Sequence, residues 1–154
     1  MDAQSSSSLA PDGSFRGFLE RSLEAIAAEM PAAYDALCAT LGCRRVVLGI
    51  DAERVGIRCD GRRLAVGDPD PGATVEFRSS PHTLRGLTSG RLSFLDAALD
   101  DRLLLRGAVD EIVVFYDGLL AYLRGAVRSP SLPGLLDAFA GRPGGAHHGE
   151  RLHV

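Results

Sequence analysis

Residues able to perform acid–base or nucleophilic chemistry are few in this sequence of 154 residues. His82 is the one histidine inside the region that we expect to fold, because His147, His148 and His153 fall near the C-terminus. No nucleophile or orienting acid is placed beside His82, which follows a proline suited to the first turn of a helix. We therefore interpret His82 as a solvated helix residue, and we predict no metal site at the C-terminal histidines.

Two pairs of neighbouring carboxylates could supply a metal site or a general acid and base: Asp100 with Asp101, and Asp110 with Glu111. Neighbours at i and i+1 point to different sides of a helix, so they do not readily share one site. Solvation at a loop end or a helix start explains them better. No phosphate-binding loop, dinucleotide fingerprint or Gly-x-Ser-x-Gly elbow occurs. The sequence therefore predicts neither catalysis nor a cofactor.

The three cysteines, Cys38, Cys43 and Cys59, form no Cys-x-x-Cys pair. An odd number at these spacings favours free thiols in a reducing compartment over disulfides or structural zinc. All 17 basic residues are arginine, which is typical of a GC-rich bacterial genome, and the net charge is −3. The absence of a clustered basic face argues against nucleic-acid binding.

The chain is long enough for one domain, and we expect a flexible leader at residues 1–13, a folded domain at 14–140 and a flexible tail at 141–154. The start shows no secretory signal, and no apolar run approaches the roughly 18 residues needed to span a membrane. We therefore expect a cytoplasmic protein that does not insert stably into membranes, although it could contact them transiently.

The first half of the chain changes from a helical to a strand pattern near residue 44. An apolar stripe between Phe15 and Met30 has the helical period, with Ser14 as its N-cap. Pro31 is expected to open a second helix that Gly42 ends. Alternating apolar residues then predict four strands, near 45–50, 53–60, 64–66 and 75–77. The Asp60-Gly61 pair indicates a two-residue hairpin turn.

The second half is rich in apolar helical patterns. Ser80 and Ser93 are expected to cap two short helices, and residues 103–105 to form a fifth strand. The helix expected at 109–127 is apolar over more than one stripe, so it is buried on most sides or faces something removable. A last short helix is expected at 132–139. Segregated strands and helices predict an α+β fold, with an antiparallel sheet that has one covered and one wet face.

A family resemblance adds to this pattern. Residues 79–99 carry a Thr-Leu start at Thr83, a short helix ending at Gly90 and a Leu-x-x-x-x-Ala segment from Leu92. A strand end at 103–110 and a long helix follow. In these features the chain resembles the sterol carrier protein-2-like family over residues 30–127, as a bacterial stand-alone member. The resemblance implies a five-stranded, largely antiparallel sheet with helices on one face, enclosing an apolar cavity that binds lipids without metal or cofactor.

The implied function is non-catalytic binding and carriage of a sterol, fatty acid, acyl-CoA or other hydrophobic small molecule. We expect the ligand between the covered sheet face and the 109–127 helix, with Tyr116, Tyr122 or an arginine orienting a polar end. Residues 129–136 are expected to cover or gate the cavity. The predicted ligand-binding residues are Phe77, Leu84, Leu87, Phe94, Leu95, Leu99, Leu103, Leu105, Ile112, Phe115, Tyr116, Leu119 and Leu123.

Two other functions stay open at this point. The apolar C-terminal helices could dock a partner protein or a second copy of the chain, because an apolar stripe does not identify its occupant. Alternatively, the protein could be an accessory enzyme that holds a hydrophobic metabolite, with His82 or a tyrosine as the acid. The residues alone do not choose among these functions.

Overall fold

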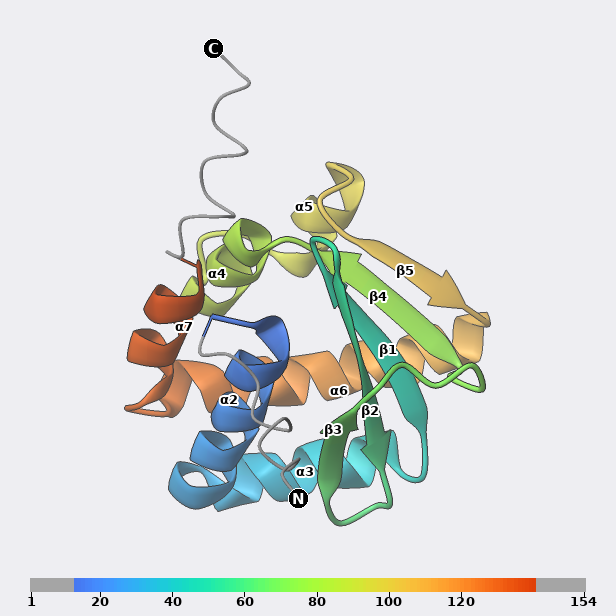
Figure 1. The fold of residues 1–154 in the computed structure, drawn as a ribbon, viewed down its shortest axis with the longest axis horizontal. Helices are drawn as coiled ribbons and strands as arrows, with labels where there is room; N and C mark the ends of the chain where they lie inside the picture. The colour runs from blue at the N-terminus through green and yellow to red at the C-terminus, as the bar shows by residue number, and fades with distance from the viewer. Residues whose placement is uncertain (1–12, 141–154) are drawn as a thin grey trace, which may run out of the picture.

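The structure is a computed structural model that describes residues 13–140, a five-stranded sheet with helices packed on one face (Figure 1). The predicted tail and nearly all of the predicted leader lie outside the described residues. In chain order the elements are α2 (Phe15–Glu29), α3 (Pro31–Leu41), β1 (Arg45–Ile50), β2 (Glu53–Cys59), β3 (Leu64–Gly67), β4 (Val75–Ser79), α4 (Pro81–Ser89), α5 (Phe94–Leu99), β5 (Leu104–Gly107), α6 (Val109–Arg128) and α7 (Leu132–Ala140). This order confirms the predicted α+β class.

The sheet has the strand order β3-β2-β1-β4-β5. Three neighbouring pairs are antiparallel, but β1 and β4 are parallel, so the sheet is mixed rather than wholly antiparallel. The parallel pair arises because the chain leaves β3 at one edge and returns on the far side of β1. The returning segment passes over Gly56, where an added Cβ would lie 2.2 Å from the carbonyl oxygen of Asp68. Glycine at this position is what lets the backbone cross so closely.

Strand alternation separates a covered face from a wet face, as the sequence predicts. Leu48 pairs with Phe77, and Phe77 pairs with Leu105, so these side chains point to the same, covered side. On the opposite side Arg45 pairs with Arg58, and both are exposed. The covered side is where a ligand could be enclosed.

The predicted helix caps are confirmed. The hydroxyl of Ser14 accepts a hydrogen bond from the backbone N–H of Gly17 at 2.9 Å, and Ser80 and Ser93 do the same three residues ahead. Each bond satisfies one of the N–H groups that a helix start leaves without a partner. Gly42 ends α3 with a φ of 61°, a conformation that glycine adopts without steric cost.

The β2–β3 hairpin is present, but its turn is shifted from the predicted position. The N–H of Asp60 donates to the carbonyl oxygen of Arg63 at 3.3 Å, so Gly61 and Arg62 occupy the centre of the turn. The Asp60 carboxylate accepts the N–H groups of Arg62 and Arg63, both at 2.9 Å. An aspartate that binds the backbone ahead of it favours this later turn over the Asp-Gly turn.

Helix α6 is the long element behind the sheet (Figure 1). Two of its glycines let α2 and α3 approach closely. An added Cβ at Gly118 would lie 2.8 Å from Cδ2 of Leu41, and one at Gly125 would lie 3.0 Å from Cγ2 of Ile26. The opposite side of α6 exposes apolar residues such as Val113 and Val127. Within residues 13–140, no helix combines the length and apolar character needed to cross a membrane.

Candidate ligand-binding site

An apolar cavity, here called the inner hollow, lies between the covered face of the sheet and the helices. Its volume is about 90 Å³. Every lining side chain is apolar except that of Tyr122. The lining residues are Phe15, Phe18, Leu19, Leu23, Leu37, Leu41, Val46, Leu48, Ile50, Ile57, Leu64, Phe77, Leu84, Phe115, Gly118, Leu119 and Tyr122.

Helix α2 forms one wall of the inner hollow. Its apolar stripe turns Phe15, Phe18 and other residues toward the sheet, as the helical period requires. The start of the helix is fixed by Glu53 of β2, whose carboxylate accepts the N–H groups of Phe15 at 2.7 Å and Arg16 at 2.9 Å. A carboxylate at this end also complements the helix dipole. The Glu53 carboxylate therefore attaches the wall to β2, and an ion pair between Arg16 and Asp68 at 3.5 Å attaches it to the segment after β3.

The sheet and α6 form the opposite walls. Phe77 of β4 and Phe115 of α6 are both buried, and their ring centroids lie 5.6 Å apart in a tilted arrangement. Such aromatic pairs contribute about 0.5–1.5 kcal/mol beyond the area that they bury. Phe115 thus ties α6 to the centre of the sheet at the edge of the hollow.

The one polar group in the lining is engaged within the protein. The hydroxyl of Tyr122 donates to Oγ of Ser22 at 3.0 Å, and Ser22 donates to the carbonyl oxygen of Leu19 at 3.0 Å. Burial raises the pKa of Tyr122 to about 12, so the phenol stays neutral at physiological pH. The prediction that Tyr122 orients a ligand would require this buried bond to break.

Helix α7 closes one end of the structure beside α2 and α4 (Figure 1). Phe139 stacks on Phe18 with ring centroids 5.0 Å apart, so α7 packs directly behind the α2 wall. The Glu29 carboxylate accepts hydrogen bonds from the hydroxyls of Ser129 and Ser131, and from the N–H of Ser131 at 3.1 Å. These bonds lower the pKa of Glu29 and link the end of α2 to the start of α7.

The predicted ligand-binding residues are not all brought together. Four of them line the inner hollow: Phe77, Leu84, Phe115 and Leu119. Six pack in or against the hydrophobic core without lining the inner hollow: Leu87, Phe94, Leu103, Leu105, Ile112 and Leu123. Phe94 and Tyr116 pack on each other at 4.8 Å, away from the lining. Leu95 and Leu99 of α5 are 66% and 72% exposed, so the hollow does not extend to α5.

Most of the lining comes from the first half of the chain, in which the sequence analysis named only Phe77 as a ligand-binding residue. Besides Tyr122, which we expected to orient a polar end, twelve residues of the lining were not among the predicted site residues, including Phe18 of α2 and Leu48 of β1. Their signal was present as the one-sided stripe of α2 and the alternation of β1 and β2. Those patterns identify a buried face, but they do not distinguish a filled core from a cavity wall.

The groups that could do chemistry lie apart from the inner hollow. His82 is exposed in the first turn of α4, as predicted. Burial raises the pKa of the Cys38 thiol to about 11, which keeps it protonated and unreactive near neutral pH. Within residues 13–140 no group of three or more His, Cys, Asp or Glu side chains could hold a metal ion.

Comparison with known proteins reveals likeness in fold rather than in sequence. No family model matches the chain, and no curated protein matches its sequence. A UbiJ-SCP2 ubiquinone synthesis protein superposes with a TM-score of 0.52 at 15% identity, covering 69% of this chain and 94% of its own. A sterol carrier protein 2 gives a TM-score of 0.52 at 15% identity, covering 73% and 98%.

A third solved structure, of a conserved hypothetical protein from Thermus thermophilus, gives a TM-score of 0.50 at 17% identity, covering 75% of this chain and 92% of its own. In all three comparisons nearly the whole of the other chain is matched. The chain therefore has the sterol carrier protein-2-like fold, which confirms the fold predicted from the motifs.

Proposed function

We propose that this chain, which has the sterol carrier protein-2-like fold, binds a lipid or another hydrophobic small molecule in the inner hollow and catalyses no reaction. The observation that carries the proposal is the lining, where the one polar side chain is already hydrogen-bonded to Ser22. A pocket of this composition recognises a ligand by shape and apolar contact. Sterols, fatty acids and acyl chains are the ligand classes that present such surfaces.

The energetics of the empty inner hollow favour occupancy. Apolar cavities exclude water, because water would lose hydrogen bonds inside them. Leaving about 90 Å³ empty costs roughly 2 kcal/mol, at about 24 cal/mol per Å³ of cavity. An apolar ligand group that fills this space restores the missing dispersion contacts.

The size of the inner hollow implies that binding moves one of its walls. Typical ligand pockets have volumes of roughly 300–1,000 Å³, several times the volume found here. The strands are held by ladder hydrogen bonds, whereas α2 is held by packing and by side-chain contacts, among them those of Glu53, of the Arg16–Asp68 ion pair and of Tyr122 with Ser22. We therefore propose that α2 or α7 moves outward as the ligand enters. We further propose a cytoplasmic carrier that contacts membranes only transiently.

A protein-interaction or dimerisation module is the second candidate, and exposed apolar residues support it. Leu95 and Leu99 of α5, together with Val109 and Val113 of α6, are more than half exposed. Exposed apolar side chains of this kind favour a partner surface when they are contiguous. Native mass spectrometry of protein purified from its own host separates the candidates: a retained lipid supports carriage, whereas an empty dimer supports the interaction module.

A pair of matched variants tests the position of the ligand. Leu119 lines the inner hollow, and Leu123 lies one helical turn further along α6 outside the lining; both are partly buried. We expect Leu119→Trp to lower the affinity for a fluorescent fatty acid by about tenfold, because the indole fills the cavity. Leu123→Trp should change it less than about twofold. Equal effects of the two variants would contradict the proposed position.

A further inference from the structure

A wide groove on the described surface lies outside the inner hollow, between α4, α6 and α7. Its volume is about 570 Å³, within the usual range for ligand pockets. We call it the α7 groove. It is separate from the inner hollow: on α4, Leu84 lines the hollow, whereas the next residue, Arg85, lines the groove.

The α7 groove combines two kinds of surface. Its apolar part is formed by Val127 of α6 and by Leu132 and Leu136 of α7. Its polar part includes Arg85 and Arg91, which lie on the α4 side. An apolar floor beside guanidinium groups suits a ligand that has an apolar chain and an anionic head.

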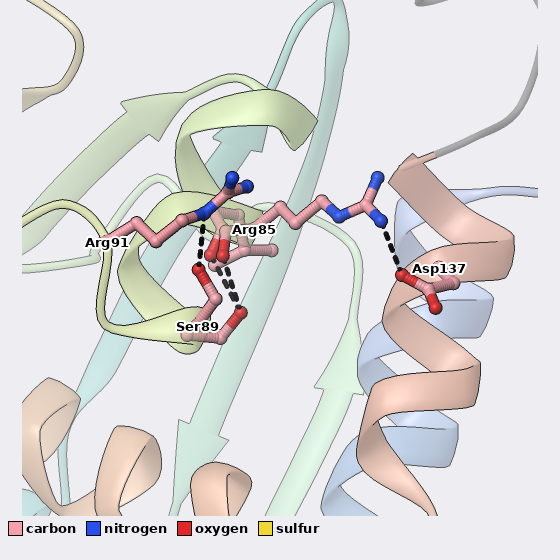
Figure 2. Close-up of polar contacts among 6 residues, drawn as sticks. Arg85, Ser89, Arg91 and Asp137 are labelled. Atoms are coloured by element: carbon pink, nitrogen blue, oxygen red, sulfur yellow. Dashed lines mark hydrogen bonds and ion pairs between the residues drawn. The ribbon is translucent and has the colours of Figure 1, made fainter.

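Arg85 already binds a carboxylate across the groove. Its Nη2 lies 2.8 Å from Oδ1 of Asp137, so the side chain reaches from α4 to α7 (Figure 2). The two side chains are 43% and 64% exposed, and an exposed ion pair contributes little stability. A ligand carboxylate or phosphate can therefore replace Asp137 on Arg85 at small cost.

Arg91 supplies a second cation with no competing acid. Its Nε donates to the hydroxyl of Ser89 at 3.4 Å, a neutral partner (Figure 2). Among residues 13–140 it forms no ion pair. Two arginines against Asp137 leave one net positive charge in the groove, although the whole chain carries −3. This local excess of positive charge favours an anionic occupant.

We propose that the α7 groove is a second ligand site, which binds the anionic head group of a single-chain amphiphile through Arg85 and Arg91 and its chain along Val127 and Leu132. The site goes beyond the proposed function of the inner hollow and does not depend on it. The shared chemistry is a carboxylate or phosphate head on an alkyl chain, whether from a free fatty acid or from a lysolipid.

The test uses the full chain and dodecyl phosphate below its micelle concentration, with calorimetry as the readout. Dodecanol has the same chain without the charge, and inorganic phosphate has the charge without the chain. We expect dodecyl phosphate to bind about threefold to tenfold more tightly than either one. If dodecanol bound as tightly as dodecyl phosphate, the arginines would not contribute to binding. If inorganic phosphate bound as tightly as dodecyl phosphate, the alkyl chain would not contribute.

Variants locate the site. The double variant Arg85→Gln/Arg91→Gln should lose about threefold to tenfold in affinity for dodecyl phosphate, whereas Arg124→Gln, an exposed α6 residue outside the lining, should match wild type. Asp137→Asn should bind about twofold to threefold more tightly, because Arg85 loses its internal competitor. Unchanged binding by the double variant would overturn the proposal. Leu119→Trp blocks the inner hollow alone, so we expect this variant to bind dodecyl phosphate as wild type does. This result would show that binding in the α7 groove does not depend on the inner hollow.

The source of the head group is resolved in a parallel measurement. Dodecanoate and a lysophosphatidic acid are titrated against wild type and the double variant. Weaker binding of both to the double variant supports the shared anion chemistry, and the tighter of the two identifies the preferred head. If dodecanoate and lysophosphatidic acid bound the double variant as tightly as wild type, the result would contradict the proposed site.

Discussion

The inner hollow and the α7 groove differ in what they can recognise, although only a few residues of α4 and α6 separate them. The inner hollow has apolar walls and a volume of about 90 Å³, and its one hydroxyl is bonded inside the protein. The α7 groove measures about 570 Å³ and carries two arginines and an aspartate. We expect burial to select ligands by shape in the first and charge to select them in the second.

This difference shows how the fold distributes apolar and charged side chains between the inner and outer surfaces of its helices. Polar groups are costly where α2 and α6 close over the sheet, so the charged side chains of α4 and α7 lie on the outer surface of these helices. Helix α7 takes part in both regions, since Phe139 stacks on Phe18 behind the hollow while Asp137 pairs across the groove. Variants on either side of α7 therefore test whether the two regions are independent.

The largest expected effect comes from truncating the wall of the inner hollow. Phe18 is 1% exposed, so Phe18→Ala should lower the free energy of unfolding by about 3–5 kcal/mol, measured by urea denaturation. Leu95→Ala, at a position that is 66% exposed, should change it by less than about 0.5 kcal/mol. A Phe18→Ala protein that retained wild-type stability would show that the hollow already tolerates empty space.

A smaller effect is expected from the hydroxyl inside the hollow. Tyr122→Phe removes the bond to Ser22, which keeps its own bond to the carbonyl oxygen of Leu19. The free energy of unfolding should fall by about 1 kcal/mol in the same denaturation experiment. Fatty-acid affinity should stay unchanged, because the ring that lines the hollow remains. A large gain in affinity would instead indicate that the hydroxyl obstructs the ligand.

The attachment of α7 should depend on pH through Glu29. Hydrogen bonds from Ser129 and Ser131 hold the pKa of Glu29 below its usual value, so the ionised form favours the folded arrangement. This contribution is complete above the unfolded pKa near 4.5 and is lost as the pH falls through the lower folded value. The protection of α7 amides against hydrogen exchange, taken relative to the intrinsic exchange rate at each pH, should therefore fall at acid pH in wild type. In Glu29→Gln this pH-dependent change in the exchange of α7 should be absent. A change of the same size as in wild type would mean that another group causes it.

The smallest effect belongs to the ion pair of the α7 groove. Arg85→Gln should lower the free energy of unfolding by less than about 1 kcal/mol, because the Arg85–Asp137 pair is exposed to solvent. The difference from wild type should shrink further at 1 M salt, measured by thermal denaturation. A loss comparable to that of Phe18→Ala would mean that the pair, rather than packing, holds α7 in place.

Much of the fold could be predicted because its signals are local. The hydroxyls of Ser14, Ser80 and Ser93 cap the helices that begin after them, and strand alternation placed the covered face correctly. The parallel pairing of β1 with β4 could not be read from the residues, because either direction buries the same alternate side chains. The turn at Gly61 shifted because the Asp60 side chain binds the backbone ahead of it.

The candidate site could be predicted only in part. Apolar density drew the prediction to the second half of the chain, yet α5 leaves Leu95 and Leu99 in solvent. Helical periodicity reports which residues share a face, but not whether another element covers that face. The wall formed by Phe15 and Phe18 depends on Glu53. This residue lies 38 and 37 positions along the chain from the two residues whose N–H groups it accepts. Contacts at this separation have no signature in local spacing.

The attachment of α2 through Glu53 has a consequence for the speed of ligand uptake. The Glu53 carboxylate and the Arg16–Asp68 ion pair hold the start of the helix, so α2 can swing away without breaking any bond of the β-ladder. Entry into the inner hollow would then wait for this opening rather than for collision with the ligand. In stopped-flow mixing, the observed rate of uptake should level off at high ligand concentration, and the plateau would report how often the wall opens.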